Sequence, residues 1–230
     1  MENNIHYNRL YLILLKKGLV LFLLLLFSNP ASGGTTTLGE ILTRIQYTYE
    51  TTEDMKALFQ QETFIRSKNK KEREEGIFYY KKPRRMVWDY QKPKAKKIII
   101  NPQKSWLYLP EEKLVYVQDT DNLLKTRIAA RFFAGMGNIK EDFTASFANT
   151  DKERGNHYIL SLIPKERNLG LEELILAIEK ESFLIHRLSF ADSFGNATTL
   201  TFREMKVNNR IDDNFFSFMP PKGVEVIHAR

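Results

Sequence analysis

The sequence predicts a mainly β protein of the α+β class: a single, strongly curved, unclosed antiparallel β-barrel with helices over its open concave side. Segments with period-two alternation follow one another across 76–118 and 157–207. Two apolar segments have helical spacing instead: 37–49 precedes the alternating stretches, and 122–136 lies between them. The stretch 76–90 carries bulky side chains on both faces. This is typical of a sheet that is covered on both sides or curved round an apolar space, and an ordinary sandwich core is the alternative.

The N-terminal segment has the features of a cleaved signal peptide. Lys16 and Lys17 precede the apolar run Gly18–Phe27, and small residues follow at the expected cleavage site, after Gly33 or Gly34. The alternative, a membrane anchor, is less favoured because the run after the lysines is shorter than the roughly 20 apolar residues that a span requires. The predicted organisation is a signal peptide over 1–33 and one domain over 34–230.

Composition narrows the class of protein and its compartment. The 230 residues contain no cysteine, which excludes disulfides, thiolate metal sites and a cysteine nucleophile. The formal net charge is +7. An exported chain without cysteine is typical of a bacterial periplasm, which is the predicted location.

The first element of the domain is predicted to be a helix. Thr37 and Glu40 have the spacing of a capping box. An apolar stripe with helical spacing, which we expect to lie on a sheet, is formed by Leu38, Ile41, Leu42, Ile45 and Tyr49.

A long hairpin is predicted next. Alternation begins at Met55, and the strand after Gly76 is rich in aromatic residues. Between them, the polar and basic segment Ser67–Glu75 is predicted to be a long, mobile loop. Pro83 is predicted to end the second strand at the basic corner Lys82–Arg85.

The parity of the strand residues predicts which side chains face the concave side. Phe78, Tyr80 and Lys82 share one face, and Met86, Trp88 and Tyr90 share a face of the next strand. The short strands that follow, near 97–100, 105–109 and 113–118, continue an antiparallel meander. The predicted lining of an apolar cavity is Phe78, Tyr80, Met86, Trp88, Tyr90, Ile98, Ile100, Trp106 and Tyr108.

The segment 122–136 is predicted to be a second apolar helix that packs on the concave face as a lid. A plain crossover helix is the alternative. The lid residues are predicted to be Leu124, Ile128, Phe132 and Phe133. Further strands are expected near 157–163, 173–178, 182–191 and 197–207, followed by a tail over 214–226.

The residues support binding rather than catalysis. His157, His186 and His228 have no ligand or triad partner at a recognisable spacing, and no phosphate-binding glycine loop or zinc pattern is present in the sequence. We therefore expect no catalytic residue, no metal and no cofactor. Basic residues are interleaved with aromatic ones near 68–97, but export argues against nucleic acid as a partner. Attraction to an acidic partner or to anionic lipid headgroups is one remaining interpretation, and a plain soluble basic surface is the other.

Four motifs, in order, resemble the periplasmic carriers of outer-membrane lipoproteins, the LolA family. Ala57–Gln61 is similar to the family's first strand, and Gly76–Pro83 followed by Trp88 is similar to its glycine, aromatic strand, basic-proline corner and tryptophan. Ser105–Tyr108 resembles its tryptophan-x-tyrosine strand, and Phe216–Val224 resembles its C-terminal double-proline ending. The resemblance covers essentially the whole mature chain.

The resemblance implies a periplasmic chaperone that binds the acyl chains of lipoproteins in an apolar cavity and carries them to the outer membrane. It further implies an inner-membrane ATP-driven exporter as donor, an outer-membrane lipoprotein as acceptor, and a monomer. A lipid or glycolipid carrier, or a sensor of envelope stress, on the same fold is the alternative. A basic surface-interaction protein with a filled core is a third interpretation.

The chain departs from the family pattern at the basic corner. Lys82 stands where well-studied members have an arginine that hydrogen-bonds to the lid helices, and Met86 stands where a phenylalanine is usual. Lysine cannot make the planar forked contact of arginine. We expect Lys82 to act as the lid latch by donating to carbonyls near Phe133 to Gly135, at the negative end of the lid helix.

Overall fold

The structure is a computed structural model that describes residues 36–122, 138–148, 155–166, 172–192 and 194–228. The predicted signal peptide lies outside the described residues. The helical elements are α2 (Leu38–Thr51), α5 (Ile139–Asp142), and the 3-10 turns η1 (Arg66–Lys68) and η3 (Asp213–Phe216). The strands are β1 (Asp54–Ile65), β2 (Lys70–Lys81), β3 (Arg85–Lys92), β4 (Lys96–Ile100), β5 (Lys104–Leu109), β6 (Leu114–Asp119), β7 (Phe143–Phe147), β8 (His157–Pro164), β9 (Leu174–Glu179), β10 (Ile185–Ala191), β11 (Ala197–Val207) and β12 (Glu225–His228).

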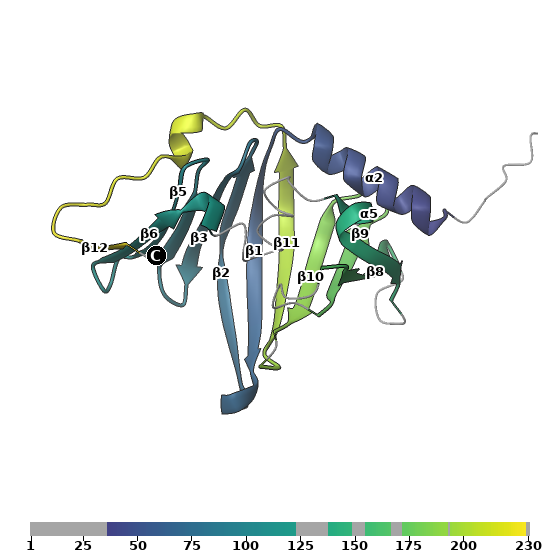
Figure 1. Cartoon of the computed structure of the whole chain (residues 1–230), viewed down its shortest axis with the longest axis horizontal. Helices are drawn as coiled ribbons and strands as arrows, with labels where there is room; N and C mark the ends of the chain where they lie inside the picture. The colour runs from purple at the N-terminus through teal and green to yellow at the C-terminus, as the bar shows by residue number, and fades with distance from the viewer. Residues whose placement is uncertain (1–35, 123–137, 149–154, 167–171, 193, 229–230) are drawn as a thin grey trace, which may run out of the picture. The chain divides into compact units, whose positions relative to one another are not determined.

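All of these strands join one sheet, in the order β12-β6-β5-β4-β3-β2-β1-β11-β10-β9-β8-β7. Neighbouring strands are antiparallel except β12, which runs parallel to β6. Strands β12 and β7 stand at the two ends of the strand order, so the sheet is open (Figure 1). The predicted class, a mainly β protein with a single unclosed and strongly curved sheet, is confirmed.

Helix α2 forms as its capping and periodicity predicted. The Thr37 hydroxyl accepts from the backbone N–H of Glu40, and the Glu40 carboxylate accepts from the N–H of Thr37 at 2.8 Å. Ile41, Leu42 and Ile45 are buried. The apolar stripe therefore lies against the sheet, and the polar face of α2 is left to solvent.

No helix within the described residues is both long and apolar enough to cross a membrane.

The hairpin of β1 and β2 is longer than predicted. Strand β2 begins at Lys70 and pairs with β1 in continuous register from Ile65↔Lys70 to Asp54↔Lys81. The expected long, mobile loop over 67–75 is therefore wrong: only the turn η1 and Asn69, at φ 46°, connect the strands. Charged residues such as Lys, Glu and Arg can pair across two exposed strands, so a polar segment can be a strand as well as a loop. The loop was predicted from the polarity of the segment alone. Figure 1 shows this hairpin reaching beyond its neighbours.

The sheet is covered on both faces along β2, β3 and β4. On the concave face, α2 and side chains of β1, β2, β3, β10 and β11 form a buried cluster, which we call the main core. On the convex face, the C-terminal segment places Phe216 on Val87 and Ile99, with Phe218 packed beside them. The sequence left open whether the sheet is curved and covered on both sides or belongs to an ordinary sandwich. The sheet is covered by a helix on its concave face and by a chain segment on its convex face, and not by a second sheet.

Three elements were not predicted. A short helix, α5, leads into β7, and the tail continues past η3 to form β12. Each is four or five residues long. Such short segments carry too few periods for their pattern to be read. His228, at the end of β12, pairs with Val117 of β6.

The convex-face core gives a prediction about stability. Phe216 is 1% exposed, whereas its neighbour Phe215 is 46% exposed and packs on Tyr79 with ring centroids 4.5 Å apart. We expect Phe216→Ala to lower the free energy of unfolding by about 3–5 kcal/mol, because it leaves a cavity under the C-terminal segment. Phe215→Ala, the matched control, should cost about 1 kcal/mol. Urea unfolding followed by circular dichroism measures both, and equal losses would show that Phe216 is not the anchor.

Candidate functional site

The concave face carries most of the predicted lining. Strand alternation turns these side chains inward, and α2 covers them near its C-terminal end. Those in the main core are Phe78, Tyr80, Met86, Tyr90 and Ile100, and the half-buried Trp88 and Ile98 pack against it. The predicted parity of β2, β3 and β4 is therefore correct.

Two of the predicted lining residues lie on the other face. Trp106 pairs with Ile99 and Tyr108 pairs with Lys97, so both point to the convex side. Both rings pack against Phe218, at centroid distances of 6.0 and 5.4 Å. The assignment of Trp106 and Tyr108 to the cavity is wrong, because the turn between β4 and β5 sets a register that places Leu107 on the concave face opposite Ile98.

Aromatic rings pack together along the middle of the concave face, with Phe59 edge-on to Trp88 and Tyr90 and with Phe78 tilted against Trp88. The Trp88 ring lies 4.4 Å from Phe78 and 5.0 Å from Phe59, and the Phe59 ring lies 4.8 Å from Tyr90. Gly76 makes this approach possible. A Cβ there would lie 2.1 Å from the Asp89 carbonyl oxygen and 2.9 Å from the Phe59 ring, so only glycine fits.

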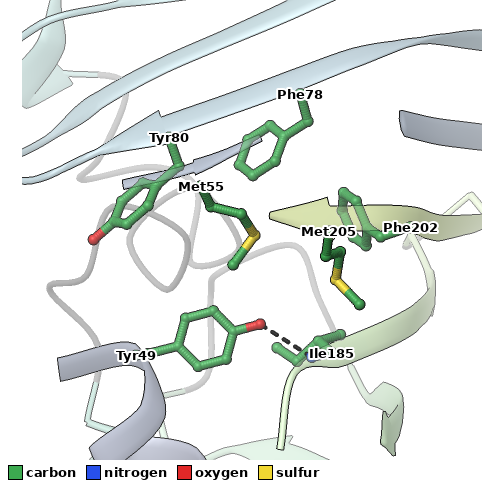
Figure 2. A pocket seen from close by; sticks show the side chains of 7 residues that line it. All are labelled: Tyr49, Met55, Phe78, Tyr80, Ile185, Phe202 and Met205. Atoms are coloured by element: carbon green, nitrogen blue, oxygen red, sulfur yellow. Dashed lines mark hydrogen bonds between the residues drawn. The ribbon is translucent and has the colours of Figure 1, made fainter. Parts of the chain in front are cut away.

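A small apolar cavity lies where α2 meets the sheet (Figure 2). Its volume is about 10 Å³, the room that one water molecule needs. The described residues that line it are Tyr49, Met55, Phe78, Tyr80, Ile185, Phe202 and Met205. The cavity is therefore nearly closed by flexible methionines and by the aromatic rings, and a larger guest requires these side chains or α2 to move.

Tyr49 holds α2 to the sheet across this cavity. Its hydroxyl accepts a hydrogen bond from the backbone N–H of Ile185 at 3.1 Å (Figure 2). That N–H is available because the register of β9 and β10 shifts between Ile185 and Arg187. Burial raises the pKa of Tyr49 well above its ordinary value, so the hydroxyl stays neutral.

Lys82 also contacts α2, at a different place from the one predicted. Its Nζ donates to the carbonyl oxygen of Glu50, and its backbone N–H donates to the carbonyl of Glu53 at 2.9 Å. Glu50 lies in the last turn of α2, where carbonyls lack helical partners and the helix dipole is negative. The expected acceptors at 133–135 lie outside the described residues, as do the predicted lid residues Leu124, Ile128, Phe132 and Phe133. The helix that the ammonium contacts is α2.

The short helix α5 contacts the outward side of α2. The Gln46 side-chain oxygen accepts from the N–H of Ile139 at 3.2 Å, and the Lys140 ammonium donates to the Thr43 hydroxyl at 2.7 Å. Helix α2 is thus held by hydrogen bonds at its side chains Thr43, Gln46 and Tyr49 and at the Glu50 carbonyl, which Lys82 contacts. Each is a single hydrogen bond, which contributes about 1 kcal/mol when neutral and somewhat more when charged.

A polar group of residues marks the end of the concave face away from Lys82. Tyr90 donates to the Gln61 side-chain oxygen at 2.9 Å, and Lys96 pairs with Glu74 at 2.6 Å while lying 4.2 Å above the Tyr90 ring. Burial, with the Glu74 carboxylate as a smaller cause, raises the pKa of Tyr90 above its ordinary value. The apolar part of the face therefore has a defined polar border.

Two basic residues of the β1–β2 hairpin are paired with carboxylates of the same strand. Lys70 lies 3.0 Å from Glu72, and Arg73 lies 2.6 Å from Glu75. Such exposed pairs add little stability, but they reduce the local positive field. Attraction to an acidic partner and a soluble charged surface therefore both stay predictions for this hairpin.

No metal site is found among the described residues, since they contain no group of three or more histidine, cysteine or carboxylate side chains that could hold an ion. His157 and His186 stack with ring centroids 4.8 Å apart. The two residues come from β8 and β10 and were not predicted to meet. A pair of rings without a third ligand does not form a metal centre.

The cavity residues that the sequence analysis missed come mostly from distant strands. Ile185 belongs to β10, and Phe202 and Met205 belong to β11. Strand β11 pairs with β1, from which it is far removed in the sequence, and β10 pairs with β11. Tyr49 and Met55 were placed correctly on their helix and strand, but not assigned to the site. Their parity was visible in the sequence, but the strand order that brings them beside Phe78 was not.

Comparisons with known proteins agree with this architecture. Residues 50–219 match the family described as outer membrane lipoprotein carrier protein LolA. Proteins named outer-membrane lipoprotein carrier protein include one from Pseudomonas aeruginosa, 30% identical over 74% of this chain and 79% of its own length. Another, from Legionella pneumophila (strain Corby), is 27% identical over 91% of this chain and 98% of its own. An uncharacterized conserved protein from Thermus thermophilus shares the fold, with a TM-score of 0.54 at 16% identity, covering 83% of this chain and 98% of that one.

Tyr80 gives a prediction about pH. Burial, and to a lesser extent the Glu53 carboxylate, raises the pKa of Tyr80 from 10.0 to about 12. Between these values the unfolded chain ionises while the folded protein does not, so rising pH stabilises the unfolded state. We expect the free energy of unfolding to fall between pH 10 and about 12, with Tyr80 contributing at most about 3 kcal/mol. Urea midpoints across this range measure it. The free energy of unfolding of the Tyr80→Phe variant should fall less over this pH range than that of the parent protein. If both proteins lose the same amount, other groups cause the loss.

Proposed function

Because this chain belongs to the LolA family of outer-membrane lipoprotein carriers, we propose that its concave face binds the acyl chains of lipoproteins and shields them from water during transport. The observation that carries the proposal is the apolar concave face itself. Phe78, Trp88 and Ile98 line it. Helix α2 covers part of it with its buried apolar side chains and with hydrogen bonds to Lys82 and Ile185. Binding, not catalysis, is the activity that this arrangement supports.

The energetics suit a carrier that must also release its cargo. Each methylene moved from water into an apolar site contributes about 0.8 kcal/mol. In the structure the cavity is nearly closed, so admitting an acyl chain requires breaking contacts such as those of Lys82 and Tyr49. The free energy of closing α2 onto the sheet therefore opposes binding and assists release.

The family supports the remaining proposals. We infer that the protein works in the periplasm as a monomer, takes cargo from an inner-membrane ATP-driven exporter, and passes it to an outer-membrane acceptor lipoprotein. No cofactor enters this scheme. The relatives named above favour lipoprotein cargo over the alternative roles of glycolipid carrier or envelope-stress sensor.

The two tryptophans of the chain provide a direct test of binding. Trp88 lies on the concave face and Trp106 on the convex face. In a Trp106→Phe variant, we expect a synthetic triacylated lipopeptide to shift the fluorescence of Trp88 to shorter wavelength, because acyl chains displace water from the ring. The Trp88→Phe variant, which keeps only Trp106, is the control and should show no shift. Binding that shifts Trp106 instead would place the lipid on the other face.

Lys82 provides the test of the latch. Lys82→Leu removes the donor to Glu50 and destabilises the closed, empty state, so we expect lipopeptide to bind but to leave about tenfold more slowly. Lys82→Arg should keep normal release. The measurement is transfer of a fluorescent triacylated lipopeptide to phosphatidylethanolamine–phosphatidylglycerol vesicles.

Lys92→Leu serves as the control for that experiment, because it removes the same charge from an exposed position on β3. If Lys82→Leu releases lipopeptide as fast as the parent and the Lys92→Leu variant, Lys82 belongs to the solvated basic corner and the latch lies elsewhere.

A further inference from the structure

A single row of side chains crosses the sheet from the main core to the β12 edge. Residues that are directly paired on neighbouring strands share a face, so the register defines the row. Its members, each the Cα partner of the next on strands β1 to β6 and then β12, are Ala57, Phe78, Trp88, Ile98, Leu107, Tyr116 and Ile227. All of them are apolar or aromatic.

Exposure increases along this row. Phe78 is 2% exposed and lines the cavity beneath α2, whereas Tyr116 is 38% and Ile227 is 37% exposed. Trp88, Ile98 and Leu107 are intermediate. The row thus connects the closed cavity to the surface without a polar interruption.

The rows on either side each contain polar residues. One row passes from Met86 and Ile100 to Ser105 and Gln118. The other passes through Tyr90 to Lys96, which is paired with Glu74. Side chains of one face repeat every second residue, about 7 Å along a strand. The apolar face is therefore two side chains wide on β5 and β6, where Leu109 and Leu114 lie beside Leu107 and Tyr116. Only the row of Leu107 and Tyr116 stays apolar up to β12, because it ends at Ile227 whereas the row beside it ends at Glu225.

The length of the path suits one hydrocarbon chain. Four strand spacings separate Phe78 on β2 from Tyr116 on β6, about 19 Å. A bilayer core about 30 Å thick is made of two opposed layers of acyl chains, so each chain extends about 15 Å. A peptide would not be expected to follow this path, because added strands run along a sheet edge and not across the strands.

We propose that this row is a track for one acyl chain of the cargo, lying across β3 to β6 with its outer part on Leu107, Tyr116 and Ile227. The proposal rests on the proposed function and refines it: one chain occupies a fixed path toward the β12 edge instead of filling only the space under α2. Leu107 and Tyr116 then determine which chain lengths bind well, because they lie at the outer end of the path.

The test uses two variants matched in exposure. Tyr116→Asn introduces an amide on the track, and Leu58→Asn introduces the same group at a residue that is 39% exposed on the convex face. We expect Tyr116→Asn to weaken the binding of a triacylated lipopeptide with sixteen-carbon chains about tenfold, and Leu58→Asn to leave it within twofold. With eight-carbon chains, which are too short to reach Tyr116, both variants should bind like the parent.

Photo-crosslinking shows the path directly. A lipopeptide with a diazirine at the end of one acyl chain should label Leu107, Tyr116 or Ile227 in the parent protein, as mapped by mass spectrometry. If the parent binds but labelling is confined to the core under α2, and Tyr116→Asn binds as tightly as Leu58→Asn, the track is wrong and the carrier function stands. If the parent binds no lipopeptide, the proposed function fails and the track fails with it.

Discussion

The structure depends on one constraint: strands β2, β3 and β4 carry large apolar side chains on both faces, and both faces must be covered. Phe78, Met86 and Ile100 point to the concave side, while Val87 and Ile99 point to the convex side. Leaving either set in water would forfeit about 25 cal/mol for every Å² of apolar surface. Helix α2 covers the first set, and Phe216 on the C-terminal segment covers the second.

The two covers differ in how they are attached, and this difference bears on function. The convex cover is a short chain segment that is anchored by a fully buried phenylalanine and by ion pairs from Lys81 and Arg85 to Asp213. The concave cover is a helix that buries Ile41, Leu42 and Ile45 in the main core. Beside the nearly closed cavity, Lys82 and Tyr49 each add a single hydrogen bond to it. A cover of the second kind can move without unfolding the sheet, because the strands keep their own hydrogen bonds.

The contact made by Lys82 fits this arrangement. An arginine could satisfy several carbonyls with its planar fork, whereas the ammonium contacts the last turn of α2 at Glu50. The site of the contact also shows that the first helix of the domain is held directly by the basic corner. In this protein the concave face is thus closed by α2 at one end and bordered by the pair of Lys96 and Glu74 at the other.

Local patterns alone determined the mainly β class, the capped helix α2, and the inward parity of Phe78, Met86 and Trp88, because helical and strand periodicities are set by neighbouring residues. Only the tertiary structure decided that Trp106 faces outward, that β2 begins at Lys70, and that Lys82 reaches Glu50. These depend on strand register and on which distant segments meet. A shift of one residue exchanges the two faces of a strand, and when both faces are apolar, as in β2 to β5, the pattern does not reveal the shift.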